Sequence, residues 1–351
     1  MGCYGPPIPI CKGTPLTTTT HSDQDRHWGR LLSKYAVADN RKAAWQLVTT
    51  GGLFALAWYL MLRSLTGPYW VTLLLAVPAV GFLTRLFIFQ HDCGHGSFFK
   101  SSRANNAVGT LIGVLTLTPY WYWRRTHAIH HATSGNLDRR EFGDVDTLTV
   151  KEYKALSPWG RFAYRVYRHP FVLFVLGGSY QFILKHRFPF DIPANWRKEW
   201  ASVMGTNLAI AGLVLLAWRL IGIERFLRVQ TPIIVLMGMV GIWLFYVQHQ
   251  FEGTYWRKSP EWSFHRAAME GSSFYDLPRI LHWFTGNIGY HHIHHLASRI
   301  PNYNLPACSR DVPETRHVTR LTLADSLRCA RLHLWDAEEG RLVAFREAAR
   351  P

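Results

Sequence analysis

Three clusters of histidines are the residues of this chain whose types and spacing could do chemistry. They are His91-Asp-Cys-Gly-His95, His127-Ala-Ile-His130-His131 and His291-His-Ile-His294-His295. On a helix, the first spacing places two imidazoles one turn apart on one face, and the other two place three imidazoles at positions i, i+3 and i+4. One such pair often arises by chance. Three clusters with eight histidines in these patterns predict a polynuclear metal site.

The number of ligands narrows the choice of metal. Imidazole binds iron, zinc, copper and nickel, so ligand type alone does not name the ion. A structural zinc needs four ligands and often uses cysteine. Eight histidines, or nine with His249, would give two metals four or five protein ligands each and leave room for oxygen or water. Two redox-active irons would suit O2 activation and attack on an unactivated C–H bond, for which zinc offers no redox chemistry.

Long apolar segments must position these clusters. Four of them have about the 20 residues needed to cross a bilayer, and they pair into two hairpins. The predicted spans are 44–62, 68–90, 201–223 and 231–248. The first hairpin leads directly into the first cluster, and the second delivers His249. The predicted fold is therefore an all-α integral membrane protein with two transmembrane hairpins and a helical cap that carries a dimetal site.

Two shorter apolar runs, Ala107–Leu117 and Phe171–Leu184, are expected to form interfacial or partly buried helices. With an even number of spans before each cluster, all three clusters lie on one face. The basic segment Arg124–Arg168 predicts that this face is cytoplasmic. The connection Glu224–Gln230, which carries Arg225 and Arg228 on the other side, opposes that assignment.

Composition and charge restrict the partners and the compartment. The 351-residue chain has 39 Lys and Arg against 23 Asp and Glu, a formal net charge of +16 that suits anionic lipids or acidic proteins. It has no zinc finger, RNA-recognition signature or basic heptad helix, so no nucleic-acid partner is expected. The five scattered cysteines fit a reducing compartment.

The chain divides into three regions. Residues 1–40 are polar and lack the apolar core of a signal peptide, so they are expected in the cytoplasm. Residues 41–310 form the membrane domain. Residues 311–351 are charged, and the spacing of their apolar residues predicts a cytoplasmic amphipathic helix, with Leu321, Ala324, Leu327 and Leu334 on one face.

The three boxes, in this order and between two hairpins, resemble the membrane fatty acid desaturases over roughly Phe87 to Pro306. Three stretches look closest to the acyl-lipid desaturases that act at the Δ12 (omega-6) position. They are His91-Asp-Cys-Gly-His95, Trp123-Arg-Arg-Thr-His127, and box three running on to Arg299-Ile-Pro-Asn-Tyr-Asn-Leu305. Box three begins with His291 and no His-Pro-Gly-Gly motif occurs, which is unlike front-end desaturases with a fused cytochrome b5 domain.

The resemblance implies nine metal ligands: His91, His95, His127, His130, His131, His249, His291, His294 and His295. His249 follows the fourth span, where related enzymes place a further histidine, while His292 falls at a variable position. The resemblance also implies two non-haem irons, O2 as co-substrate, and a cis double bond formed in a membrane-lipid acyl chain. Electrons would come from an external ferredoxin or cytochrome b5-like protein. The expected location is the bacterial inner membrane, crossed several times, with the active site facing the cytoplasm.

Some residues near the histidine clusters could support the metal site. Asp92 and Asn287 could orient an imidazole through its second ring nitrogen. Asp138, Asp144 and Asp146 could touch a headgroup or electron donor, although most carboxylates in such a loop face water. Tyr120–Trp123 is expected to form an interfacial aromatic belt, and the Arg85 side chain is expected to reach toward the headgroups. The other histidines are expected at the surface or the membrane interface: His21, His27, His169, His186, His265, His282, His317 and His333.

Alternatives stay open at this point. A hydroxylase or ketolase acting on a lipid, alkane or carotenoid would share the same scaffold, although the Arg299–Leu305 match favours desaturation. A metal transporter would place ionisable groups inside its spans, and here the spans lack histidine. Chain length, regiochemistry, acyl carrier, electron donor and oligomeric state do not follow from the sequence.

Overall fold

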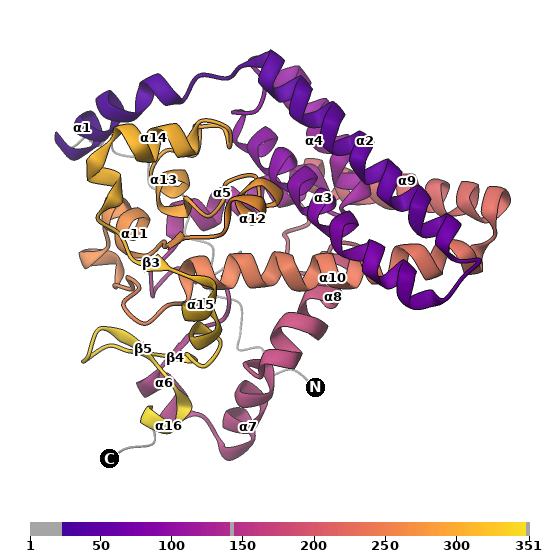
Figure 1. The fold of residues 1–351 in the computed structure, drawn as a ribbon. Coiled ribbons are helices and arrows are strands. Elements are labelled where there is room, and N and C mark those ends of the chain that lie inside the picture. Colours follow the sequence, from indigo (N-terminus) through magenta and orange to yellow (C-terminus); the bar gives the residue numbers. More distant parts are fainter. Residues whose placement is uncertain (1–22, 141–143, 349–351) are drawn as a thin grey trace.

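A computed structural model describes residues 23–140 and 144–348. Four helices in it are long and apolar enough to cross a membrane: α2 (Asn40–Ser64), α3 (Tyr69–His95), α9 (Arg197–Ile221) and α10 (Ile223–His249). They form the two predicted hairpins (Figure 1). The prediction of a helical membrane-protein fold with four helices able to span the bilayer is confirmed.

The helices extend beyond the predicted spans at their functionally important ends. At 1.5 Å per residue, the 27 residues of α3 run for about 40 Å, roughly 10 Å more than the hydrocarbon layer. The excess carries His91 and His95 in the last turns of α3, before Gly96 ends the helix with a φ of 70°. His249 is likewise the last residue of α10. Three of the predicted ligands therefore lie on the ends of span helices.

The second hairpin turns more tightly than expected. The prediction of a charged connection at 224–230 is wrong, because α10 already begins at Ile223. Gly222, with a φ of 85°, makes the turn alone. Glu224 suits the first turn of a helix, and it pairs with Arg228 at 3.6 Å. The charged residues thus form the first turns of the fourth span.

Apolar and small residues pack the spans together. One core cluster joins α2, α3 and α10 through Ala57, Met61, Ala76, Leu83 and Ile233. Two short helices pack on this bundle from the histidine side: α4 (Ser102–Leu115) and α5 (Tyr120–Thr133). The predicted short helix at 107–117 therefore exists as part of α4.

The segment between the hairpins continues along the side of α10. After α6 (Val150–Ala155) and α7 (Pro158–Tyr167) comes a helical run of η2 (Phe171–Leu176), α8 (Gly177–Ser179) and η3 (Tyr180–Lys185), in which η2 and η3 are π-helical. Gly178 and Gly238 meet backbone to backbone, since a Cβ on Gly178 would lie 2.5 Å from the Gly238 carbonyl carbon. The second short apolar helix is thus packed against a span.

The remaining elements build the cap, which lies beside the ends of α3 and α10 (Figure 1). Its helices are α1 (Asp23–Leu32), η1 (Ser33–Tyr35), η4 (Ser259–Glu261), α11 (Phe264–Glu270), α12 (Arg279–Phe284), α13 (His291–Leu296), α14 (Leu305–Asp311), η5 (Pro313–Arg316), α15 (Leu323–Cys329) and α16 (Phe345–Ala348). Its strands are β1 (Leu148–Thr149), β2 (Phe274–Tyr275), β3 (Arg320–Leu321), β4 (Leu334–Asp336) and β5 (Arg341–Val343).

The C-terminal region differs from the predicted amphipathic helix. The strands order as β1-β4-β5, with β1 parallel and β5 antiparallel to β4, and β2 pairs with β3 in parallel. Leu321 lies in β3 and Leu334 in β4, so the four apolar residues do not share one helix. Of the four residues behind the predicted helical period, Leu321 and Leu334 are buried in separate strands, whereas Ala324 and Leu327 are exposed on α15.

Candidate metal centre

Nine histidines from four helices come together in two groups. The first contains His91, His95, His127, His131 and His294, and the second contains His130, His249, His291 and His295. Within each group, one ring nitrogen from every member lies within 4.8 Å of the others. These are the nine predicted ligands, and His292 belongs to neither group.

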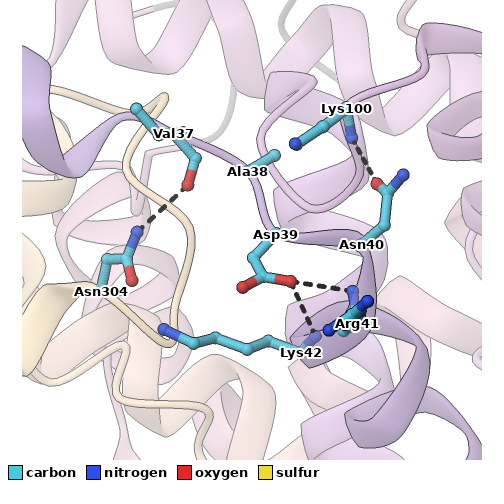
Figure 2. A pocket seen from close by; sticks show the side chains of 8 residues that line it. All are labelled: Val37, Ala38, Asp39, Asn40, Arg41, Lys42, Lys100 and Asn304. Atoms are coloured by element: carbon cyan, nitrogen blue, oxygen red, sulfur yellow. Dashed lines mark hydrogen bonds between the residues drawn. The ribbon is translucent and has the colours of Figure 1, made fainter.

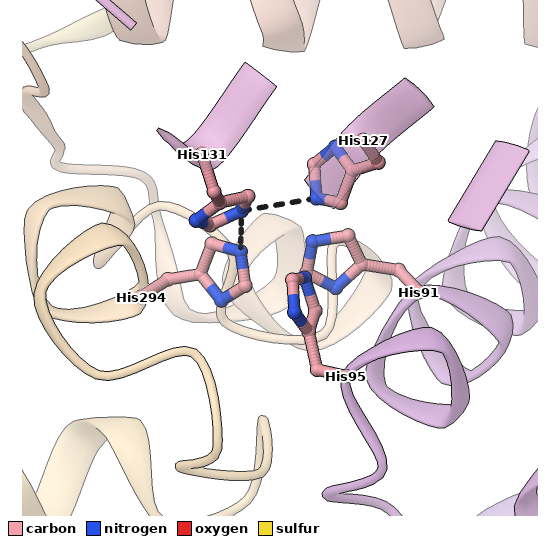
Figure 3. A group of neighbouring side chains, drawn as sticks. All are labelled: His91, His95, His127, His131 and His294. Atoms are coloured by element: carbon pink, nitrogen blue, oxygen red, sulfur yellow. Dashed lines mark hydrogen bonds between the residues drawn. The ribbon is translucent and has the colours of Figure 1, made fainter. Parts of the chain in front are cut away.

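The spacing of each box explains how its members are shared. His91 and His95 stand one turn apart on α3 and both enter the five-histidine group. Figure 3 shows them facing the α5 and α13 members of that group. On α5, the i and i+4 residues His127 and His131 join the same group, while His130 turns to the four-histidine group.

The α13 helix also contributes to both groups, with two histidines in the four-histidine group and one in the five-histidine group. His291 and His295 enter the four-histidine group, and His294 enters the five-histidine group. A box with three histidines can therefore contribute to both groups, whereas the two-histidine box on α3 contributes to one.

The arrangement of the ring nitrogens suits metal coordination better than hydrogen bonding between the imidazoles. The Nε2 atoms of His131 and His127 are 3.1 Å apart, those of His294 and His131 3.0 Å, and those of His291 and His249 2.9 Å. A neutral imidazole has one donor and one acceptor nitrogen, so such pairs cannot satisfy every ring. The Nε2 atoms of His95, His130 and His295 are buried without a hydrogen-bond partner. This donor set is that of a metal site.

Burial also holds the imidazoles in the form that binds metal. Burial, followed by the neighbouring imidazoles, lowers the pKa of His127 and His131 on α5 well below the ordinary value. The same causes lower the pKa of His291, His294 and His295 on α13. These five rings are neutral near pH 7, with a lone pair available for a metal ion.

The two groups differ in accessibility. All four members of the second group are buried, whereas His95, His127 and His131 of the first group are partly exposed. Small molecules therefore reach the five-histidine group more directly than the four-histidine group.

Each group contains one imidazole held by a carboxylate. In the five-histidine group, His91 Nδ1 lies 3.2 Å from Asp92 Oδ1, one of the two residues that the sequence offered for orienting an imidazole. In the four-histidine group, His130 Nδ1 lies 2.9 Å from Asp144 Oδ1. His249 Nδ1 is instead 3.0 Å from the carbonyl oxygen of Gly271. When Nδ1 donates to these oxygens, Nε2 is left free to face the other ligands.

The sequence named Asp144 only as one of three aspartates that could touch a headgroup or an electron donor, and its contact with His130 was not predicted. Asp144 lies thirteen residues beyond His131 in an irregular segment, and no helical or strand period relates the two positions. The only available signal was the presence of three aspartates after box two. Asp138 serves differently, because its Oδ2 accepts a hydrogen bond from the backbone N–H of Ser259.

Asn287 does not contact an imidazole within the described hydrogen bonds. Its φ of 59° turns its side chain toward Asn302, whose carbonyl oxygen accepts from Asn287 Nδ2 at 3.1 Å. Asn302 in turn donates to Asp92 Oδ2 through its backbone and side-chain nitrogens, at 2.7 and 2.9 Å. The stretch Arg299–Leu305 thus fixes the carboxylate that holds His91.

The aromatic run before box two supports the site and is not a membrane belt as a whole. The ring of Trp123 stacks on that of His127, with centroids 4.5 Å apart. Gly94 leaves space for it, since a Cβ there would lie 2.8 Å from the indole. Tyr120 is buried and donates to the carbonyl oxygen of Cys93 at 2.8 Å. Packing by helices distant in sequence removed these side chains from the interface.

The same long-range packing buries Arg85 and His186, which were expected at the headgroups and at the surface or interface. Arg85 is buried and donates to the carbonyl oxygen of Trp283, with its guanidinium carbon 4.4 Å from the indole centroid, so it does not reach the headgroups. His186 is buried, with Nδ1 3.2 Å from the carbonyl oxygen of Leu117. His282 and His333 are partly buried, His265 is half-buried, and His27, His169 and His317 are exposed, while His21 lies outside the described residues.

A hollow of about 500 Å³ lies away from the histidines, at the start of α2 (Figure 2). Asp39 at its centre caps α2, because its Oδ1 accepts from the backbone N–H groups of Arg41 and Lys42 at 2.9 and 3.2 Å. No histidine of either group lines this hollow. It is therefore separate from the metal centre.

Comparison with known proteins identifies the family. The family described as "Fatty acid desaturase" matches residues 68–323, which contain all nine histidines. The chain belongs to the fatty acid desaturase family. It is therefore an oxidoreductase that acts on fatty acyl chains, and three of its nine clustered histidines stand at the ends of helices long and apolar enough to cross a membrane.

Individual relatives of this desaturase agree. A "Fatty acid desaturase" of Bacillus subtilis (strain 168) is 44% identical over 331 residues, covering 94% of each chain. A Synechocystis "sn-1 acyl-lipid omega-3 desaturase (ferredoxin)" is 29% identical, covering 63% of this chain and 61% of the relative. A "Delta(12)-oleate desaturase" of Trichosanthes kirilowii is 25% identical, covering 63% of each. The chain thus spans most of the Bacillus relative and about three fifths of the other two.

Proposed function

We propose that this desaturase uses two irons, held by the nine histidines, to form a cis double bond in a membrane-lipid acyl chain. The reaction takes two hydrogens from adjacent methylenes, adds two electrons and two protons from outside, and reduces one O2 to two waters. Bound iron would supply the O2 activation. The observation that carries the proposal is the convergence of nine buried or half-buried imidazoles into two adjacent groups.

The chain's own residues would hold and orient the irons. His91, His95, His127, His131 and His294 would bind one ion, and His130, His249, His291 and His295 the other. Asp92 and Asp144 would fix one imidazole in each group through Nδ1. They would also offset part of the positive charge that two divalent ions place among neutral ligands.

We infer a multi-pass protein of the bacterial inner membrane, with the metal centre on the cytoplasmic side. Both α3 and α10 end in the histidine groups, so the two hairpins open on one face. The basic segment Arg124–Arg168 lies on that face, which favours the cytoplasm.

The proposed regiochemistry is Δ12, or omega-6-like. The Arg299–Leu305 stretch and the name of the Trichosanthes relative support it, whereas the Synechocystis relative is named for omega-3 desaturation. That relative's name also mentions ferredoxin, which supports an external ferredoxin or cytochrome b5-like donor.

Lipid analysis after expression tests this function. The chain is produced in a bacterial host that makes only saturated and monounsaturated lipids, together with a compatible donor, and the acyl chains are profiled with double-bond location. We expect a new diene, absent with His130→Ala and retained with His317→Ala, an exposed histidine outside both groups. A hydroxy or keto lipid without a diene would establish the alternative activity, and a double bond elsewhere would overturn the Δ12 assignment alone.

A further inference from the structure

The α7 helix exposes one apolar face in the part of the chain that the structure describes. Trp159 is 73% exposed, Phe162 54% and Val166 42%. Their spacing of three and four residues puts them on one side of α7, and the rings of Trp159 and Phe162 lie 5.2 Å apart. On the opposite side, Tyr164 is buried in the cap and donates to the carbonyl oxygen of His333 at 2.9 Å. The helix is therefore firmly attached by one face only.

The fold fixes the level of α7 relative to the membrane. Arg168, directly after α7, is buried, and its guanidinium donates to Tyr246 Oη and Gln250 Oε1, both at 3.2 Å. These residues stand at the end of span α10, beside His249. The C-terminal end of α7 is thus held at the level of the membrane boundary where α10 ends.

The apolar face continues into a second run of exposed apolar residues. Three residues after Arg168 the chain enters the helical run η2, α8 and η3, which packs along α10. This run exposes Phe171 (56%), Leu176 (50%) and Tyr180 (56%) on its outer side. Figure 1 shows α7 at the cap end of this run, extending away from the four spans.

The charges beside the apolar face are basic. Arg161 and Arg165 lie on α7 without a carboxylate ion pair in the described part of the chain. Their guanidiniums donate to uncharged groups, the Lys154 carbonyl oxygen at 3.3 Å and Tyr153 Oη at 2.7 Å, so their positive charge is not neutralised. Arginine beside exposed tryptophan and phenylalanine, on a helix at the membrane boundary, is the composition of an interfacial helix that binds anionic lipid.

We propose that α7 lies in the headgroup layer of an anionic bilayer, with Trp159, Phe162 and Val166 inserted toward the acyl chains. It anchors the cap to the membrane at a place outside the four spans. The Arg168 guanidinium also donates to the carbonyl oxygen of Asp146 at 3.0 Å, two residues from Asp144. The lipid surface is thereby linked to the loop that holds His130. This inference rests on the membrane arrangement proposed above.

Depth measurement on the full chain tests the proposal. Cys3 and Cys11 are replaced by serine, the buried Cys93, Cys308 and Cys329 are kept, and one new cysteine carries an environment-sensitive fluorophore. The test variant is Phe162→Cys. Controls are Leu208→Cys, 74% exposed on span α9, and Glu338→Cys, exposed in the turn between β4 and β5. Each variant is reconstituted in vesicles of phosphatidylcholine and phosphatidylglycerol.

Quenching then distinguishes the outcomes. We expect spin-labelled lipid to quench the label at position 162 and iodide to quench it several-fold less than at position 338. Iodide quenching equal to that at position 338 would overturn the proposal. Protection from iodide without quenching by lipid would also overturn it, because a protein would then cover α7. Failure of the label at position 208 to report lipid would refute the membrane arrangement itself.

Discussion

Replacing Asp144 with alanine should selectively weaken the four-histidine group. The Asp144 carboxylate is the only described side chain that contacts the Nδ1 atom of His130, at 2.9 Å, and the His130 side chain is fully buried. A hydrogen bond to a charged group contributes about 1.5–3 kcal/mol, and about 1.4 kcal/mol corresponds to a tenfold change in an equilibrium constant. We therefore expect iron affinity at this group to fall about 10- to 100-fold, the range known for residues that orient metal ligands.

The assay is iron binding to metal-free protein in detergent, followed by titration and by metal analysis at limiting iron. The matched control is Asp146→Ala, because Asp146 contributes only backbone atoms to the described hydrogen bonds of the same loop. Asp144→Asn, which keeps an acceptor oxygen and loses the charge, should fall between wild type and Asp144→Ala. Wild-type affinity in Asp144→Ala, or an equal loss in Asp146→Ala, would refute the reasoning.

Two further predictions concern stability. Burial lowers the pKa of His186 to about 3, so the unfolded chain takes up a proton below about 6.5 while the folded chain does not. The contribution of His186 to stability should therefore fall by about 2 kcal/mol between pH 7 and pH 5 and be constant above pH 7. Denaturation of wild type and His186→Asn in detergent checks this, and an equal pH slope in both would contradict it. Gly178→Ala should destabilise by about 1–3 kcal/mol, because its Cβ would meet Gly238, whereas Gly205→Ala meets nothing within 4 Å. Equal melting temperatures for the two glycine variants would show that α8 and α10 do not pack this closely.

The sequence predicted those parts of the molecule that depend on local periodicity. Spans are long apolar runs, and histidines at helical spacing share one face, so both hairpins and the eight box histidines follow from local pattern, whereas His249 came from the resemblance to the family. The start of α10 was missed because a polar first turn looks like a loop until Gly222 is seen to make the turn.

What could not be predicted depends on contacts between distant segments. Asp144 meets His130, and Trp283 covers Arg85, through packing that no sequence spacing records. The strands of the cap are two or three residues long, too short for a period of two to be recognised. Their apolar residues consequently resembled one amphipathic helix.

The most direct test of the central claim is the number of irons bound per chain in variants of each group. Wild type and His292→Ala should bind two, because His292 lies in neither group. His294→Ala should lose iron from the five-histidine group and His295→Ala from the four-histidine group, each leaving one tightly bound ion. Wild-type protein that saturates at one iron or none, or variants that keep two, would contradict a dinuclear centre built from these imidazoles.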